Sequence, residues 1–320
     1  IMSLRKFGKA AFFHVQDESG KMQVYARRDL LGEEFQRFKK WDVGDIVGVE
    51  GKLFKTKTGE PSLEASRLYM ITKSLRPLPE KFHGLTDVET RYRQRYVDLI
   101  VNPEVRETFR KRVKIIRLIR EFLTERGFME VETPMMQPVP GGATAKPFQT
   151  HHNALDMDLF LRIAPELYLK RLLVGGFERV FEINRNFRNE GLSTRHNPEF
   201  TMLEFYQAYA TYEDLMDLTE EMISSLATQV CGSAEIIYQG MPVNLAPPWQ
   251  RYTMDQALIE VGGIDPELLQ DDTTVMGLAK KHGIKLQPDA GPGKAKTELF
   301  ELLVEEKLID PTFITAYPAE

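Results

Sequence analysis

The sequence predicts an α+β protein in which a small all-β domain precedes a larger domain built on an antiparallel sheet. In residues 1–73, short strand-like runs alternate with polar, Gly-containing turns, as in "AFFHVQDESGKMQVYARR", which is typical of a small barrel or sandwich. A long amphipathic helix is predicted next, followed by two alternating strands, 179–188 and 199–209, joined by a loop. A chain of 320 residues is long enough for about two domains.

The connection between the two domains is predicted from "LRPLPEKFHG", residues 75–84, which holds two prolines and a glycine. We expect domain limits of 1–74 and 103–320, with 75–102 as a linker. The helix over 103–126 begins with Asn102 and Pro103 as N-cap and first-turn proline and stops at Gly127. Its predicted apolar stripe recurs every three or four positions and comprises Val105, Phe109, Val113, Ile116, Ile119 and Leu123.

Shorter elements follow that helix. "FMEVETPMMQP" predicts a strand ended by prolines, 158–163 a second strand, and Pro165 and Gly175 the two ends of a short helix. Thr211 and Asp214 have the spacing of a capping box before another helix. From about residue 235 the pattern indicates loops and short helices.

Composition narrows the class of protein. A 42% hydrophobic and 28% charged content is that of a soluble globular chain, and no apolar run approaches the roughly 20 residues of a membrane span. The lone Cys231 excludes an intramolecular disulfide framework and suits the cytoplasm. Residues 1–80 have a net charge of +4 and the remainder −9, so a polyanion is a candidate partner of the first domain, although scattered surface charge explains the imbalance equally well.

The segment "FEINRNFRNEGLSTRHNPEF", residues 181–200, is dense in charge, with three arginines, three glutamates, a histidine and four asparagines. Side chains alternate between the faces of a strand, so Phe181, Ile183 and Phe187 share one face of the first strand. The opposite face combines Glu182, Asn184, Asn186 and Arg188, and the returning strand adds Phe200, Met202, Glu204 and Tyr206. We interpret this polar face as the floor of a ligand site for a nucleotide, with a salt-bridged surface hairpin as the alternative.

The same segment, continued through "TMLEFYQAY", resembles motif 2 of class II aminoacyl-tRNA synthetases. "GFMEVETPMM" after the long helix resembles motif 1, and the upstream β-region resembles the anticodon-binding OB-fold of the lysyl, aspartyl and asparaginyl subgroup. "PGGATAKPF" and "RIAPELYLKRLLVGG" are similar to lysyl members of that subgroup. The resemblance covers nearly the whole chain and implies a catalytic domain on an antiparallel sheet behind an OB-fold barrel.

The resemblance implies a ligase that activates L-lysine with ATP and transfers it to the 3′ end of tRNA(Lys). Arg188 is then the catalytic residue, which binds the α-phosphate of ATP and the substrate carboxylate. The implied ATP-binding residues are Arg188, Glu190, Arg195, His196, Asn197 and Phe200, with Glu190 reading the adenine amino group and Phe200 stacking on the ring. The implied lysine-binding residues are Gly142, Glu166, Arg188, Glu204 and Tyr206. Glu166 has a second interpretation, as a first-turn carboxylate that the helix dipole favours.

In the first domain, the resemblance implies an anticodon site made of Arg5, Phe12, Gln23 and Glu60. Phe12 can stack on a base and the polar residues can bond base edges; the alternative for Phe12 is a core aromatic. Motif 1 implies a homodimer through the 103–126 helix and the following strand. We expect the first OB strand to be missing, and expect motif 3, a further lysine-pocket carboxylate and the Mg²⁺ ligands to lie beyond Glu320, so this segment alone is expected to be inactive.

Other chemistry is disfavoured. His151 and His152 are adjacent and cannot share a metal on one strand face, so no metal ligand is assigned. Three rival functions stay open: an aspartyl- or asparaginyl-tRNA synthetase, which needs a basic side-chain pocket; a lysine ligase that modifies an elongation factor; and a non-catalytic RNA-binding module derived from a synthetase.

Overall fold

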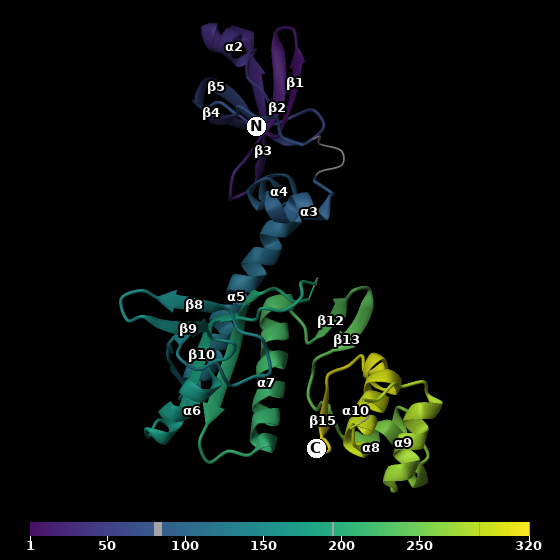
Figure 1. Cartoon of the computed structure of the whole chain (residues 1–320). Coiled ribbons are helices and arrows are strands. Elements are labelled where there is room, and N and C mark those ends of the chain that lie inside the picture. Colours follow the sequence, from purple (N-terminus) through teal and green to yellow (C-terminus); the bar gives the residue numbers. More distant parts are fainter. Residues whose placement is uncertain (80–84, 194, 288, 320) are drawn as a thin grey trace. The chain divides into compact units, whose positions relative to one another are not determined.

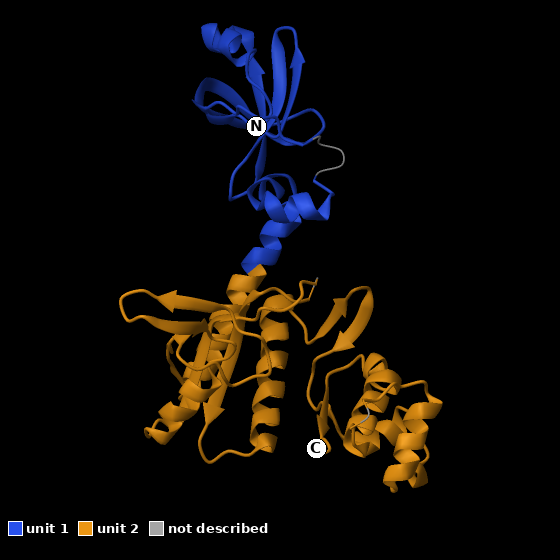
Figure 2. Cartoon of the chain, in the orientation of Figure 1, with its two compact units in different colours: residues 1–110 blue, residues 111–320 orange. Residues whose placement is uncertain are grey.

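The computed structural model describes residues 1–79, 85–193, 195–287 and 289–319. It divides into two compact units, Ile1–Arg110 and Lys111–Glu320 (Figure 2). Within the described residues no helix is long and apolar enough to cross a membrane.

Unit 1 is built on a five-stranded sheet with the order β1-β2-β3-β5-β4, antiparallel except for the parallel β3–β5 pair (Figure 1). Its strands are β1 (Ser3–Phe7), β2 (Ala10–Gln16), β3 (Lys21–Arg27), β4 (Ile46–Lys55) and β5 (Pro61–Thr72). Two short helices, α1 (Arg28–Leu31) and α2 (Glu33–Phe38), separate β3 from β4. Phe13 of β2 and Phe35 and Phe38 of α2 are buried in the core that the sheet and these helices share. The prediction of an OB-fold barrel domain is confirmed.

The predicted linker is more structured than expected. Helices α3 (Val88–Arg93) and α4 (Arg95–Val101) lie within residues 75–102, and part of "LRPLPEKFHG" falls outside the described residues. The buried carboxylate of Asp98 joins them, since it accepts from Arg91 Nε at 2.9 Å and forms an ion pair with Arg95. The Asn102 side-chain amide donates to the same carboxylate at 2.7 Å. Asn102, at the C-terminal end of α4, is thereby bonded to a residue of that helix. The domain limits 1–74 and 103–320 remain a prediction.

Unit 2 contains the predicted long helix and strand pair. Its elements up to residue 231 are the continuation of α5 (Pro103–Glu125), β6 (Met129–Glu130), β7 (Met136–Gln137), β8 (Gln149–His152), β9 (Met157–Leu161), α6 (Glu166–Val174), β10 (Arg179–Phe187), β11 (Glu199–Gln207) and α7 (Tyr212–Cys231). The six strands among these elements form two three-stranded sheets, β11-β10-β6 and β7-β9-β8. The apolar side of β10 and β11 packs on α5 and α7 through a cluster that includes Phe122, Phe181 and Met222.

The local sequence signals of unit 2 hold with two exceptions. The capping box of Thr211 and Asp214 forms at the start of α7, and Pro165 and Gly175 flank α6. The stretch "FMEVETPMMQP" was wrongly predicted as one strand: it forms β6 and β7, which lie in different sheets. Pro134 lies between them and has no N–H for a sheet ladder. The predicted apolar stripe of α5 is also not fully buried, because Val113, one of its residues, is 66% exposed.

The chain after residue 231 forms a hairpin and a helical lobe; the short helices were predicted from the sequence, but the four strands that the structure describes in this region were not. Its elements are β12 (Glu235–Tyr238), β13 (Met241–Asn244), β14 (Gln250–Thr253), α8 (Met254–Glu260), the 3₁₀ helix η1 (Pro266–Leu269), α9 (Asp272–Lys281), α10 (Pro292–Leu303), the 3₁₀ helix η2 (Glu305–Lys307) and β15 (Thr312–Thr315). Parallel pairing of β14 with β15 and a separate apolar cluster hold the lobe together. Arg251 forms ion pairs with Asp217 and Glu220 of α7, which tie the lobe to the rest of unit 2.

Candidate functional site

The register of β10 and β11 places the predicted polar side chains on one face. Antiparallel pairing sets Glu182 opposite Glu204, Asn186 opposite Phe200 and Val180 opposite Tyr206. Because opposite residues of paired strands point to the same side, the parity argument from the sequence holds. The other face carries the apolar side chains that pack on α5 and α7. The charged hairpin is therefore one side of a core sheet, and the surface-hairpin interpretation does not describe it.

A cavity of about 230 Å³ lies at the end of this strand pair where the connecting loop joins β10 to β11. It is lined by Arg188, Glu190, Gly191, Arg195, His196, Asn197 and Phe200. All six residues assigned to ATP from the sequence therefore meet in one place. The Arg188 guanidinium carbon lies 5.3 Å from the centroid of the Phe200 ring, so a fixed positive charge and an aromatic face are adjacent there.

The loop between the strands is fixed at both ends. Arg188 N–H donates to the Pro198 carbonyl at 2.9 Å, which closes the hairpin. The Ser193 hydroxyl and His196 Nδ1 are 2.8 Å apart, so a turn presents the imidazole. Asn189 N–H donates to the Lys146 carbonyl at 2.7 Å, which joins the hairpin to the loop that carries Gly141 and Gly142.

Buried polar atoms without partners concentrate under this face. In the described part of the chain, four buried side-chain atoms have no hydrogen-bond partner: Arg162 Nη2, Asn186 Nδ2, Asn186 Oδ1 and Arg188 Nε. Unpaired buried groups are costly and uncommon in folded proteins. Their clustering on a single face indicates a site that binds a polar ligand.

A second, acidic group lies beside the start of α6. Glu204 accepts a hydrogen bond from the Tyr206 hydroxyl at 2.9 Å. Burial raises the pKa of the Glu204 carboxyl, and the negative charge of Glu166 raises it further, while the Tyr206 hydrogen bond opposes both. Burial and the Glu204 carboxylate together raise the pKa of the Tyr206 hydroxyl above its ordinary range, so Tyr206 is a neutral donor.

Gly142 belongs to the same group. Its φ of +88° lies in the left-handed region, and a Cβ added there would be 3.0 Å from the Glu166 Cβ and 3.4 Å from the Ala164 Cβ. Only glycine suits both the conformation and the close approach. The Glu166 carboxylate accepts from the Lys170 ammonium at 2.6 Å, and that nitrogen lies 5.9 Å from the Tyr206 ring centroid. Gly142, Glu166, Glu204 and Tyr206, assigned to lysine from the sequence, therefore lie in one group, in which the Lys170 ammonium contacts Glu166 and the Tyr206 ring.

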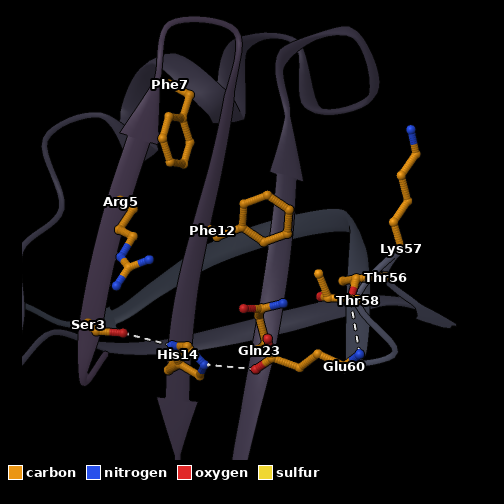
Figure 3. A pocket seen from close by; sticks show the side chains of 10 residues that line it. All are labelled: Ser3, Arg5, Phe7, Phe12, His14, Gln23, Thr56, Lys57, Thr58 and Glu60. Atoms are coloured by element: carbon orange, nitrogen blue, oxygen red, sulfur yellow. Dashed lines mark hydrogen bonds and ion pairs between the residues drawn. The ribbon is translucent and has the colours of Figure 1, made fainter.

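The predicted anticodon residues of unit 1 also share a cavity, of about 560 Å³. Figure 3 shows Arg5, Phe12, Gln23 and Glu60 around it. Phe12 is half-buried and stacks on Tyr25 with ring centroids 4.5 Å apart, whereas its neighbour Phe13 is fully buried. The core interpretation therefore applies to Phe13, and Phe12 lines the cavity.

Sequence reasoning missed two groups of residues. In unit 1, His14 connects Ser3 (2.7 Å) to Glu60 (3.4 Å) along one wall of the cavity (Figure 3). In unit 2, Arg162 and Thr133 lie directly against Glu182. An arginine within the apolar run "LFLRIAP" was the available signal, because a charge inside a buried strand requires a partner.

Comparison with known proteins agrees with this geometry. Residues 87–320 match the family model of class II tRNA synthetases (D, K and N), and residues 1–71 match the OB-fold nucleic acid binding domain. The chain is 60% identical to the lysine–tRNA ligase of Carboxydothermus hydrogenoformans, of which it covers 66%. It is 59% identical to that of Thioalkalivibrio sulfidiphilus, covering 64%, and 58% identical to that of Coxiella burnetii, covering 65%. All of this chain is matched in each comparison, and it spans about two thirds of the length of these relatives. With its OB-fold first unit, the chain belongs to the class II tRNA synthetases of the D, K and N group.

Proposed function

We propose that the protein activates L-lysine with ATP and transfers the lysyl group to the 3′ end of tRNA(Lys). The observation that carries this proposal is the pairing of two neighbouring sites on one sheet face: a nucleotide-type cavity at Arg188 and Phe200, and an acidic pocket at Glu204 and Tyr206. The names of the similar proteins, all lysine–tRNA ligases, support it. In the first step a lysine carboxylate oxygen attacks the α-phosphorus, which forms lysyl-adenylate and expels pyrophosphate.

The cavity residues suit ATP by their chemistry. The Arg188 guanidinium can bind both the attacking carboxylate and the α-phosphate, and it offsets the charge that accumulates between them. Phe200 offers a ring face for adenine, and Glu190 can accept from its amino group. Arg195 can supply positive charge and His196 a hydrogen-bond donor for the outer phosphates, with Asn197 beside them. Among the described residues of the site we assign none as a covalent nucleophile, and we attribute the rate acceleration to positioning and charge neutralisation.

The acidic pocket favours a cationic amino acid. A substrate ammonium can pair with Glu166 and Glu204, as the Lys170 ammonium pairs with Glu166 in this structure. A neutral amino acid leaves those carboxylates without a partner, which is a strong basis for discrimination. Aspartate adds a third negative charge, so the acidic pocket argues against an aspartyl-specific enzyme. The Gly142 backbone is suited to the α-amino group because no side chain blocks it.

Mg²⁺ accompanies ATP in our proposal, but we assign no residue to it. Among the residues that the structure describes, no group of three or more His, Cys, Asp or Glu side chains could hold a metal ion. We assign phosphate binding by the chain itself to Arg188, Arg195 and His196.

The other partners follow from unit 1 and α5. We propose that the Phe12 cavity takes an anticodon base, stacked on Phe12 and bonded at its edge by Gln23, Glu60 and Arg5. We also propose a homodimer through α5 and β6, supported by the exposed apolar side chains of Val113 and Met129. We place the protein in the cytoplasm, in keeping with its lone, unpaired Cys231.

ATP–pyrophosphate exchange with each amino acid tests the proposal. Because the similar lysine–tRNA ligases are longer than this chain, the assay uses the full-length protein that carries it. We expect exchange with lysine alone. Exchange with aspartate or asparagine, or none with any amino acid, contradicts the proposal; tRNA binding without any exchange would instead indicate an RNA-binding module.

A further inference from the structure

A fully buried ion pair lies beneath the polar face of β10. Arg162, which follows β9, donates from Nη1 to Glu182 Oε1 at 2.7 Å, and their side chains are 0% and 1% exposed. Two charges at this depth are costly to desolvate, and a fold rarely gains stability from them over apolar residues. The residues around the pair suggest a different purpose.

Hydrogen bonds fix both partners of the pair. Arg162 Nε donates to the Arg185 carbonyl at 2.9 Å, and Nη1 also donates to the Thr133 hydroxyl oxygen at 3.0 Å. The Glu182 carboxylate accepts from the Thr133 hydroxyl at 2.7 Å and from the Asn184 amide at 3.1 Å. Neither charged group can rotate away without losing several of these bonds. Arg162 Nη2, in contrast, is buried and has no partner within the described residues.

The pair lies next to the acidic pocket. Glu182 is the register partner of Glu204 on the neighbouring strand and shares its face. The charged or titratable groups that act on Glu204 are Glu182 from β10, Arg162 after β9, Glu166 from α6, and Tyr206 on its own strand. Lys170 also approaches from α6, but it is bonded to Glu166 at an exposed position. Three carboxylates therefore share one region, where Arg162 is the one buried cation in the part of the chain that the structure describes.

We propose that Arg162 is a positioning residue of the amino-acid site: held against Glu182, it supplies the counter-charge that allows the neighbouring Glu204 to act as a carboxylate toward a cationic substrate. Arg162 is no catalytic residue, because it acts through Glu182 and Glu204. That the substrate is lysine rests on the proposed function; the control of Glu204 by the pair does not.

The physical reason is electrostatic. Burial and the charges of Glu166 and Glu182 raise the pKa of the Glu204 carboxyl, and the Arg162 charge opposes them. A raised pKa means that the carboxyl becomes protonated first as the pH falls, and a neutral carboxyl cannot pair with an ammonium. Without Arg162, both carboxylates would repel each other across the strands with no counter-charge. If residue 182 carried no charge, the Arg162 guanidinium would still lower the pKa of Glu204, and no Glu182 charge would oppose it.

The two halves of the pair therefore have opposite predicted effects. Glu182→Gln should lower the titration midpoint of Glu204, because it removes a neighbouring negative charge, and Arg162→Met should raise it, because it removes the opposing positive charge. The double variant Arg162→Met/Glu182→Gln removes one charge of each sign and should return the midpoint close to wild type. Arg162→Lys keeps the charge and should change it little.

The measurement is a ¹³C NMR titration of the full-length protein labelled at the glutamate side-chain carboxyl, with the Glu204 signal assigned by its loss in Glu204→Gln. The acid limb of kcat/KM for lysine should move in parallel, with the change in KM rather than kcat. Packing damage alone would not shift the midpoint in opposite directions. If Arg162→Met does not fold, the Glu182→Gln, Arg162→Lys and double variants still decide the question.

The inference is overturned if the Glu204 midpoint moves in the same direction in Glu182→Gln and Arg162→Met, or if it moves in neither. In the absence of foldable Arg162→Met, an unmoved midpoint in Glu182→Gln does so. The NMR titration needs no turnover, so its result is separate from the proposed function. A wild-type protein without lysine-dependent exchange would refute lysine activation while the titration still reports on the pair.

Discussion

Replacing Arg188 with alanine separates a role in chemistry from a role in folding. Within the described residues the Arg188 side chain makes no hydrogen bond or ion pair, and its Nε is buried without a partner. Its main contact is with the Phe200 ring, 5.3 Å away, and such a contact contributes about 0.5–1 kcal/mol. The Arg188 N–H bond to Pro198 belongs to the backbone and remains in the variant. The free energy of unfolding should therefore fall by no more than about 1 kcal/mol.

The loss of activity should be much larger. If the guanidinium stabilises the charge that builds between carboxylate and α-phosphate, its removal should slow ATP–pyrophosphate exchange by about 10²–10³-fold or more, equivalent to about 3–4 kcal/mol of transition-state stabilisation. The assay is exchange by the full-length protein, with thermal unfolding measured on the same preparation. Exchange within tenfold of wild type would remove Arg188 from its assigned role.

Arg185 provides a matched control on the same strand. It points to the opposite face of β10, its side chain is 50% exposed, and within the described ranges its one ion pair is with Glu199 at 3.6 Å. Its carbonyl, which Arg162 uses, is unaffected by substitution. Arg185→Ala should leave exchange within about twofold of wild type, because exposed ion pairs contribute little. Equal losses in both variants would indicate general damage to the hairpin.

Three further predictions concern the remaining sites. Phe12→Ala should weaken tRNA binding by about 1–3 kcal/mol, measured by filter binding with folding checked by circular dichroism; unchanged affinity would remove Phe12 from the anticodon site. Gly142→Ala should raise KM for lysine several-fold, because its φ of +88° and the 3.0 Å approach to Glu166 exclude a side chain; an unchanged KM would contradict an amino-acid site there. Val113→Asp should dissociate the proposed dimer in light scattering, whereas Val174→Asp, at a side chain that is 91% exposed, should not; a dimer that persists in Val113→Asp would place the contact elsewhere.

The pH dependence of the acidic pocket follows from the raised pKa of Glu204. Its protonated form is favoured in the folded protein, so its contribution to the free energy of unfolding is largest below the pKa of the unfolded chain and is lost as the pH rises through the folded value. Lysine binding has the opposite dependence, since it needs the ionised carboxylate. We expect the affinity for lysine, measured by calorimetry, to fall as the pH decreases through the folded value, while the same protonation does not weaken the fold.

Local signals in the sequence determined much of this protein. A period of two separated the apolar and polar faces of residues 179–188 and 199–209, and the observed register keeps that division. Helix ends followed from residues within one turn, as at Thr211 and Asp214. The residues that line the Arg188 cavity were within reach for a related reason: they lie within 13 positions of one another, on a hairpin that brings neighbours in sequence together.

Only the tertiary structure decided which distant residues meet. Arg162 and Glu182 are 20 positions apart, Thr133 and Glu182 are 49 apart, and His14 and Glu60 are 46 apart. The same applies to Val113, which has an apolar helical spacing but no covering partner within its unit. Periodicity fixes the face on which a side chain lies, because that depends on the local backbone. Which other element covers that face depends on long-range strand pairing and helix packing, and so the buried charges under Glu204 could be located only in the folded chain.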